Sequence, residues 1–423
     1  MPTAQLRLLW TRRLLPLFTA QFFGAVNDNM FKNALVILIA YRDTSGPRAT
    51  EILVTLAGAI FILPYFLFSA TAGQIADKFE KHHLVRIVKL WEIGIMLIAA
   101  AGFVLNNIYF QLAVLFGLGV QATFFGPVKY AIIPELLAPD ELMGGNALIE
   151  AGTFLAILIG TIAGGLLILA PHGFIIVTAA LLAMAVIGWA AAAFIPRGRP
   201  ASPELRLEPN IFIETWSILR YAYARPDLRM PLMGISWFWF LGIAYLAQFP
   251  NFAKEIVHAD NQVVTLFLTL FSVGIGAGSL LCGRLQKGAI NARLVPLGAL
   301  GLAVFGLDFW AAGRHHGSAA ELMGAAAFLA IPANWRIAAD LFVIALSGGV
   351  YCVPLYALMQ VRSERAHRAR VIAANNIINA LFMVVAGIAS AAMLAAGLGI
   401  PSIFLALGIG NAAVAALMWW GAR

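Results

Sequence analysis

The sequence predicts an all-α membrane protein with twelve transmembrane helices in two halves of six. Hydrophobic residues make up 61% of the 423 residues and charged residues only 11%, whereas soluble proteins have about 45–50% apolar and about 25% charged residues. Twelve apolar segments have about the 20 residues that a helix needs to cross a bilayer. A single long polar stretch, 196–228, separates the sixth segment from the seventh.

The predicted helices follow one another with short connections. Those of the first half lie near 14–41, 50–75, 84–105, 108–128, 145–170 and 172–195. Those of the second half lie near 229–256, 262–286, 291–313, 337–360, 371–397 and 400–421. We therefore predict an N-terminal half at 1–195, a linker at 196–228 and a C-terminal half at 229–423.

The first segment follows Arg12 and Arg13, as the apolar core of a cleaved signal peptide would. It is longer than such a core and carries Asp28 and Lys32. We therefore expect a helix that stays in the membrane.

The positive charges are distributed unevenly between the two sides of the predicted bundle. Of the 28 Lys and Arg residues, 22 fall on the side of the N-terminus, five fall on the opposite side, and Lys32 lies within the first helix. Cytoplasmic loops of membrane proteins are enriched in Lys and Arg. This distribution predicts that both termini are cytoplasmic, and it explains the net charge of +8 by membrane orientation rather than by nucleic-acid binding.

The linker contains a possible amphipathic helix. Its apolar residues recur at helical spacing, and they are Phe212, Trp216, Leu219 and Tyr223. Glu214, Arg220 and Arg225 fall elsewhere around the helix. The pattern favours a helix that lies on the cytoplasmic leaflet, and a plain soluble linker helix is the alternative.

The two halves share a weak internal repeat. Pro127 precedes Asn146 by 19 residues, and Pro354 precedes Asn375 by 21 residues. Each pair brackets the predicted loop between the fourth and fifth helices of its half. Parallel six-helix halves are typical of major facilitator transporters.

The loop after the second helix, 73–81, resembles the signature of that superfamily. It has a glycine, then an aspartate four residues later at Asp77, and then Lys78 and Lys81. An aspartate there can cap a helix and pair with charges across a cytoplasmic gate. An ordinary charged loop is the alternative. The corresponding loop of the second half, 278–287, lacks the aspartate, so we expect an asymmetric gate.

Two helices carry glycines four residues apart, a spacing that lets helices pack closely in lipid. They are Gly160 and Gly164 in the fifth helix and Gly274 and Gly278 in the eighth. We interpret them as a sliding surface between the halves, although glycines are frequent enough in this chain to occur there by chance.

Asp28 is the most informative polar residue. At about 1.5 Å per residue it lies roughly 20 Å into the first helix, where a charge is costly and indicates a functional site. We predict that Asp28, Asn27 and Asn29 bind a polar head group. Lys32 follows one turn later, so a structural ion pair is the alternative.

Further polar residues are candidates for the same site. Lys129, at the predicted end of the fourth helix, can bind a phosphate or act in gating, or it can extend its charge to the membrane interface. The other candidates are amides and one acid that can also serve as hydrogen bonds between helices. They are Asn146, Glu150, Gln248, Asn375 and Asn379.

The chemistry of enzymes and metal sites has no support in the sequence. It lacks a Gly-Lys-Ser/Thr phosphate loop, a His-x4-Asp acyltransferase motif, a His-Glu-x-x-His motif and a Gly-x-Ser-x-Gly motif. Cys282 and Cys352 lie far apart in apolar segments, and His315–His316 is an isolated pair in a loop. We therefore expect a protein that is not an enzyme, with no cofactor and no metal.

Three stretches together resemble the bacterial lysophospholipid transporter family of the major facilitator superfamily. They are 21–35, 126–130 and 146–151. The aromatic stretch 236–240 resembles members that are fused to acyltransferase and ligase domains, so the chain is either a stand-alone member or the transporter part of a fusion. Leu246 stands where stand-alone members carry an arginine, which makes Lys32 or Lys129 the expected partner of Asp28.

The resemblance implies a flippase of the bacterial inner membrane. Such a protein moves lysophosphatidylethanolamine and lysophosphatidylglycerol from the outer to the cytoplasmic leaflet by alternating access, for reacylation. It implies a functional link to an acyltransferase and acyl-carrier-protein synthetase, and we expect a monomer surrounded by membrane lipids. Phe23, Trp237 and Phe249 are our candidates for a crevice that admits one acyl chain. The alternatives are a proton-coupled exporter of amphipathic drugs, with Asp28 as its protonation site, and a membrane scaffold for an acyltransferase.

Overall fold

The computed structural model describes residues 4–42, 47–105, 107–286, 289–314 and 322–421. Within these ranges the secondary structure is helical, apart from one isolated bridge between Ala259 and Met323. The predicted all-α class is confirmed. His315–His316 lies outside the described residues.

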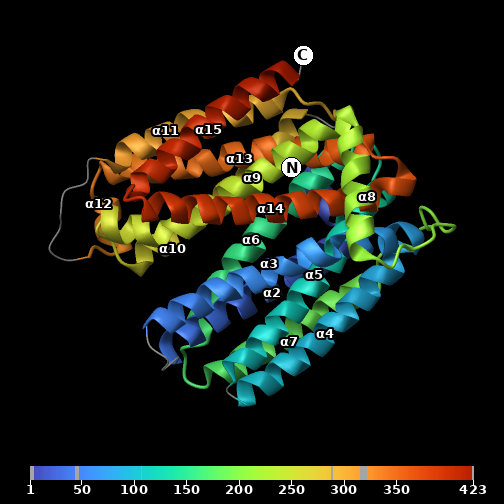
Figure 1. Cartoon of the computed structure of the whole chain (residues 1–423), viewed down its shortest axis with the longest axis horizontal. Coiled ribbons are helices and arrows are strands. Elements are labelled where there is room, and N and C mark those ends of the chain that lie inside the picture. The colour runs from blue at the N-terminus through green and yellow to red at the C-terminus, as the bar shows by residue number, and fades with distance from the viewer. Residues whose placement is uncertain (1–3, 43–46, 106, 287–288, 315–321, 422–423) are drawn as a thin grey trace. The chain divides into compact units, whose positions relative to one another are not determined.

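The first half of the chain forms a short helix and then six long ones (Figure 1). They are α1 (Ala4–Leu9), α2 (Leu15–Arg42), α3 (Pro47–Lys78), α4 (Lys81–Leu105), α5 (Ile108–Leu136), α6 (Leu142–Leu167) and α7 (Gly173–Ala192). The linker then contributes α8 (Ile211–Ala224).

The second half again has six long helices, with three short helical segments between them. They are α9 (Pro226–Asn251), η1 (Phe252–Ile256), α10 (Asn261–Gln286), α11 (Leu294–Gly313), α12 (Ala325–Ala330), α13 (Asn334–Arg362), η2 (Arg365–His367), α14 (Arg368–Ala395) and α15 (Ile400–Gly421). The segment η1 is a π-helix that continues α9.

Eleven helices in the described part of the chain are long and apolar enough to cross a membrane. The twelfth long helix, α2, has 28 residues, or about 42 Å at 1.5 Å per residue. It is less apolar because it carries Asp28 and Lys32 together with three asparagines. The chain is therefore a multi-pass membrane protein, and its described part has twelve long helices, as predicted.

One predicted boundary is wrong. The fourth apolar segment was expected to end at residue 128, but α5 continues through Pro127 and Pro134 to Leu136. Helices in membranes tolerate proline because neighbouring groups satisfy the freed backbone carbonyls. Proline therefore marks no loop here, and the connection to α6 is shorter than expected.

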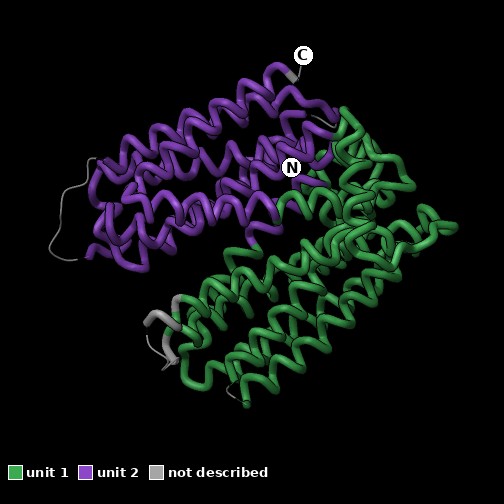
Figure 2. The backbone as a smooth tube through the Cα atoms, viewed as in Figure 1, with its two compact units in different colours: residues 1–145, 156–228, 359–380 green, residues 146–155, 229–358, 381–423 purple. Residues whose placement is uncertain are grey.

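The contacts divide the chain into two compact units (Figure 2). Unit 1 comprises Met1–Gly145, Ala156–Leu228 and Met359–Ala380. Unit 2 comprises Asn146–Leu155, Arg229–Leu358 and Leu381–Arg423.

In unit 1, α3 packs on α5, α2 on α7, and α4 on both α5 and α7 (Figure 1). Phe31, Ile95, Leu115 and Leu181 belong to the buried apolar cluster that these helices enclose. The amphipathic α8 lies against α3. This bundle holds most of the charged groups discussed below.

In unit 2, α11 packs along α15. The interior is an aromatic cluster in which the Tyr245 ring stacks on Phe404 at 5.4 Å and lies 6.2 Å from Phe309. Phe249 and Phe271 extend the cluster toward α10, with ring centres 5.6 Å apart. Aromatic pairs at these distances add to the free energy that burial of their surface provides.

Candidate functional site

A buried charged network lies inside unit 1, where α2, α4 and α5 meet. The Nζ atom of Lys89 lies 2.7 Å from Oε2 of Glu92, and both residues are fully buried. Asn27 of α2 donates to Glu92 Oε1 at 2.9 Å, and Gln121 of α5 donates to Glu92 Oε2 at 3.1 Å. A buried ion pair needs such extra hydrogen bonds to offset the cost of desolvation.

The position of Lys89 depends on its neighbours. A Cβ atom at Gly24 of α2 would overlap the ammonium group of Lys89, which would have to move away from its present position. The same ammonium lies 4.9 Å from the centre of the Phe125 ring, a cation–π distance.

Asp28 lies one residue beyond this network. Four charged groups act electrostatically on its carboxylate, and they are Glu92, Lys89, Lys32 and Lys129. Its Oδ1 atom is buried without a hydrogen-bond partner among the described residues. No Lys, Arg or His nitrogen in the described ranges lies within 4.0 Å of it.

The expected close partner of Asp28 is therefore missing from this arrangement. Lys32 donates to Oδ1 of Asn29 at 3.2 Å instead and lies 5.4 Å from the centre of the Phe61 ring. Lys129 lies inside α5, with its ammonium 4.5 Å from the Tyr130 ring. Asp28 thus has three cations in its surroundings and, among the described residues, no direct ion pair.

The predicted amides of α14 pair with each other. The side chains of Asn375 and Asn379 exchange hydrogen bonds of 3.3 and 3.4 Å, and both are buried. Gly126 of α5 packs against the neighbouring Asn376 side chain. This end of α14 and the Asp28 region both belong to unit 1.

The remaining predicted polar residues belong to unit 2. Asn146 and Glu150 are buried on α6, and Gln248 accepts a hydrogen bond of 3.5 Å from Asn251 on α9. The structure thus brings Asp28, Asn29, Lys32 and Lys129 into one region of unit 1. Asn146, Glu150 and Gln248 belong to unit 2.

The three aromatic candidates have different surroundings. Phe23 lies on α2 in edge contact with Phe22. Trp237 is partly exposed and donates to Asn411 at 2.8 Å. Phe249 is fully buried in the aromatic cluster of unit 2, where packing accounts for it.

Asp77 holds the end of α3 against the start of α14. Its carboxylate accepts the backbone N–H groups of Ala369 and Arg370 at 3.0 and 3.2 Å. It also accepts Nε of Arg370 at 3.1 Å. Asp77 is fully buried, so it acts as a cap and a charge partner for the N-terminus of α14.

The linker adds a second set of contacts at this end of unit 1. Gln74 exchanges hydrogen bonds with the backbone of Glu208, at 2.7 and 3.2 Å. Arg225 donates to Glu364 at 2.8 Å, and the ring of Tyr221 stacks on His367 at 4.7 Å. Burial raises the pKa of Glu214 on α8 above its ordinary value, because burial penalises the charged form.

The sequence profile of the Major Facilitator Superfamily matches residues 17–320. The chain belongs to the major facilitator superfamily. Two similar proteins carry the name Lysophospholipid transporter LplT. That of Citrobacter koseri is 30% identical over 98% of this chain and 97% of its own length. That of Escherichia fergusonii is 29% identical over the same shares.

Solved structures of the superfamily show the same fold. The human organic anion transporter MFSD10 superposes with a TM-score of 0.76 at 14% identity, over 95% of this chain and 99% of its own. The transporter FucP in its outward conformation gives a TM-score of 0.70 at 14% identity, over 98% of this chain and all of its own.

Each of the predicted glycine pairs packs on a helix of its own unit. A Cβ atom at Gly160 would lie 2.5 Å from the Val26 carbonyl of α2, and one at Gly278 would overlap the Leu346 carbonyl of α13. Within unit 2, a Cβ atom at Gly276 of α10 would lie 3.8 Å from the Cβ atom of Ala151 on α6. The paired glycines therefore allow close packing within each unit.

Lys89 and Glu92, near the start of the third spanning helix, lie beside Asp28. The sequence signal that could have identified them is the spacing of Lys89 and Glu92. Opposite charges three residues apart on a membrane-spanning helix are expected to face the protein interior and to pair there. Among the described residues, no cluster of His, Cys, Asp and Glu could hold a metal ion.

Proposed function

We propose that the chain is a lysophospholipid transporter that moves its substrate across the inner membrane of a bacterium. The observation that carries this proposal is the match to proteins named lysophospholipid transporters along nearly the whole chain. The small number of polar groups within the spanning helices is consistent with a lipid substrate, because a lipid needs one polar region for its head group and an apolar route for its tail.

The head group binds at Asp28. Its carboxylate has no direct counter-ion within 4.0 Å in the described part of the chain, so it is available to an ammonium group or a hydroxyl. Lys32, Lys129 and Lys89 surround it, and an ammonium from these can pair with the phosphate. Glu92 acts as a positioning residue because it holds Lys89 and Asn27 in place.

The tail is selected by aromatic residues of the first and seventh spanning helices. Phe23 and Trp237 are partly exposed, so their rings have surface for an acyl chain. A second chain would have to displace such rings, at about 1–3 kcal/mol for overpacking. Asn146, Glu150, Gln248, Asn375 and Asn379 serve the polar end of the path during alternating access.

Both termini and the linker lie on the cytoplasmic side. Two observations support this orientation. Lys and Arg residues are concentrated on the side of the N-terminus, and the large side chains Phe212, Trp216 and Tyr223 are exposed on one face of α8. Aromatic side chains of this kind are enriched at membrane interfaces. On this side the transporter, as a monomer, delivers lysophospholipid to an acyltransferase and acyl-carrier-protein synthetase, separate or fused.

A proton-coupled exporter of amphipathic drugs is the second candidate, favoured by one observation. In the described part of the chain Asp28 has no counter-ion within 4.0 Å, which suits a group that binds and releases a proton. Proteoliposomes with labelled lysophospholipid, with and without a pH gradient, test both candidates. Flipping without a gradient supports the proposed function, whereas drug export that requires a gradient and no lipid flipping supports the second.

A further inference from the structure

Two aromatic residues of α3 face the Asp28 region of α2. α3 begins five residues after α2 ends, and the two helices pack on each other, so they run in opposite directions. The ammonium of Lys32 lies 5.4 Å from the centre of the Phe61 ring. Asp28 lies one helical turn back along α2, and Tyr65 lies one turn forward along α3. The antiparallel register therefore places Tyr65 opposite Asp28.

Two further observations agree with this register. The rings of Phe61 and Tyr65 lie 6.2 Å apart, so both project from one face of α3. The charge of Asp28 acts electrostatically on the hydroxyl of Tyr65. Both aromatic residues are half-buried, as is Asp28. A charged residue in a membrane faces the protein interior or a water-filled space rather than lipid, so these side chains present a common surface there to a ligand.

The lysines around Asp28 already lie against other aromatic rings. Besides the contact between α2 and α3 described above, the ammonium of Lys89 lies 4.9 Å from the centre of the Phe125 ring. That of Lys129 lies 4.5 Å from the Tyr130 ring. These are cation–π distances. Ring faces in this region therefore attract ammonium groups.

Asp28 and Tyr65 together attract one more ammonium group. A carboxylate and the face of an aromatic ring both stabilise a cation. Oδ1 of Asp28 is buried without a hydrogen-bond partner among the described residues. Water satisfies this oxygen but carries no positive charge, so it leaves the carboxylate unneutralised in the membrane. A primary ammonium interacts with both groups, whereas a glycerol hydroxyl interacts favourably only with the carboxylate.

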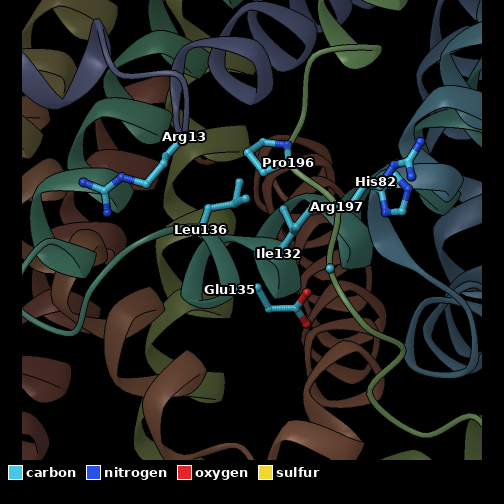
Figure 3. Close-up of a pocket in the computed structure, with 8 residues that line it drawn as sticks. Arg13, His82, Ile132, Glu135, Leu136, Pro196 and Arg197 are labelled. Atoms are coloured by element: carbon cyan, nitrogen blue, oxygen red, sulfur yellow. The ribbon is translucent and has the colours of Figure 1, made fainter.

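Other carboxylates of unit 1 lack this combination of groups. A cavity of about 130 Å³ lies near the start of α4 (Figure 3), and none of the described residues that line it is Phe, Tyr or Trp. Its carboxylate, Glu135, forms an ion pair of 2.9 Å with Lys81. Glu92 and Asp77 pair with cations at 2.7 and 3.1 Å. Asp28 instead has a ring opposite it and, among the described residues, no cation within 4.0 Å.

We propose that Tyr65 determines head-group specificity, because with Asp28 it forms an ammonium-binding corner that favours an ethanolamine over a glycerol head group. The phosphate of such a head group then pairs with Lys32, one turn along α2. The ring of Tyr65 is the selective element, since a ring face attracts a cation and not a neutral hydroxyl. This inference rests on the proposed function and adds to it the class of head group and a residue of α3.

Competition in proteoliposomes that contain the full chain tests the proposal. Unlabelled lysophosphatidylethanolamine or lysophosphatidylglycerol competes with the flipping of labelled lysophosphatidylethanolamine. The ratio of the two half-inhibitory concentrations measures preference separately from the rate. Tyr65→Leu removes the ring, and Tyr65→Phe keeps it. Phe66→Leu is the matched control, because it removes an exposed ring from the next position of α3.

The folding of each variant is measured by melting. Cys282 and Cys352 are both buried and free, so a thiol-reactive dye reports unfolding. If Tyr65→Leu melts well below the wild type, Tyr65→Met takes its place, because methionine fills irregular space with a flexible apolar chain.

We expect the wild type, Tyr65→Phe and Phe66→Leu to prefer lysophosphatidylethanolamine. Tyr65→Leu should lose about fivefold of this preference, within the range of one cation–π interaction. Three results overturn the proposal. They are equal competition by the two lipids in the wild type, an unchanged ratio in Tyr65→Leu, and an equal loss in Tyr65→Phe. A wild type that flips neither lipid contradicts the proposed function itself, so the two failures are distinguishable.

Discussion

The buried carboxylate of Asp77 at the end of α3 accepts both the backbone N–H and the Nε atom of Arg370 at the start of α14. With the N–H of Ala369 as a third donor, one side chain caps α14 and neutralises its first turn. The aspartate of the superfamily signature thus joins a helix of the first half to a helix of the second.

Replacing this residue should open the junction. In Asp77→Ala the N–H groups of Ala369 and Arg370 lose their acceptor, and loss of a helix cap costs about 0.5–2 kcal/mol. A cysteine introduced at Ala373, buried next to Gly73, should then react faster with a thiol reagent added from the Asp77 side. Asp308→Asn, which breaks the exposed pair with Arg336, is the control. An unchanged rate in Asp77→Ala would show that this contact does not hold the junction.

Loss of one charge of the Lys89–Glu92 pair should destabilise the protein more than loss of both charges. Glu92→Leu leaves the buried ammonium of Lys89 alone, and breaking a buried pair costs about 3–5 kcal/mol. The double variant Lys89→Met with Glu92→Leu removes both charges and should unfold at a higher temperature than Glu92→Leu. Melting curves read from the buried cysteines measure this order, and the reverse order would contradict the assignment.

Two neighbouring glycines of α10 should differ in their tolerance of a methyl group. In Gly278→Ala the new Cβ atom would overlap the Leu346 carbonyl, so the helix must shift and the protein should be strongly destabilised. In Gly276→Ala the nearest atom is 3.8 Å away on Ala151, an ordinary contact, so stability should change little. Similar melting temperatures for both variants would refute this packing.

The stability of the α8 contact should depend on pH through Glu214. Burial raises the pKa of this carboxyl above its ordinary value, so the folded state binds the proton more tightly than the unfolded state. Its contribution is fully present below the ordinary pKa and is lost as the pH rises through the folded pKa. Glu214→Gln should therefore melt higher than the wild type at pH 8 and equally at pH 4. A difference independent of pH would indicate a packing effect instead.

Much of the fold follows from the sequence because each spanning helix must be apolar over most of its length. The long helices from α2 to α15 accordingly lie close to the predicted segments. The pattern could not give the end of α5, because proline has little meaning as a helix boundary in a membrane.

The site was predicted less completely for a related reason. Asp28 is visible in the sequence because a charge in mid-membrane is rare. Which cation stands beside it depends on how α4 packs against α2, and the spacing of Lys89 and Glu92 gives no information on that packing. The glycines illustrate the same limit, since spacing identifies close-packing residues without naming the helix that they contact.

The central claim is that Asp28 binds the head group of a lysophospholipid during transport. Its most direct test is the initial rate of labelled lysophosphatidylethanolamine flipping in proteoliposomes that contain the wild type or Asp28→Asn at equal amounts of folded protein. We expect the variant to lose at least tenfold in rate while its melting temperature stays within a few degrees of the wild type. A variant that flips the lipid at the wild-type rate would contradict the account.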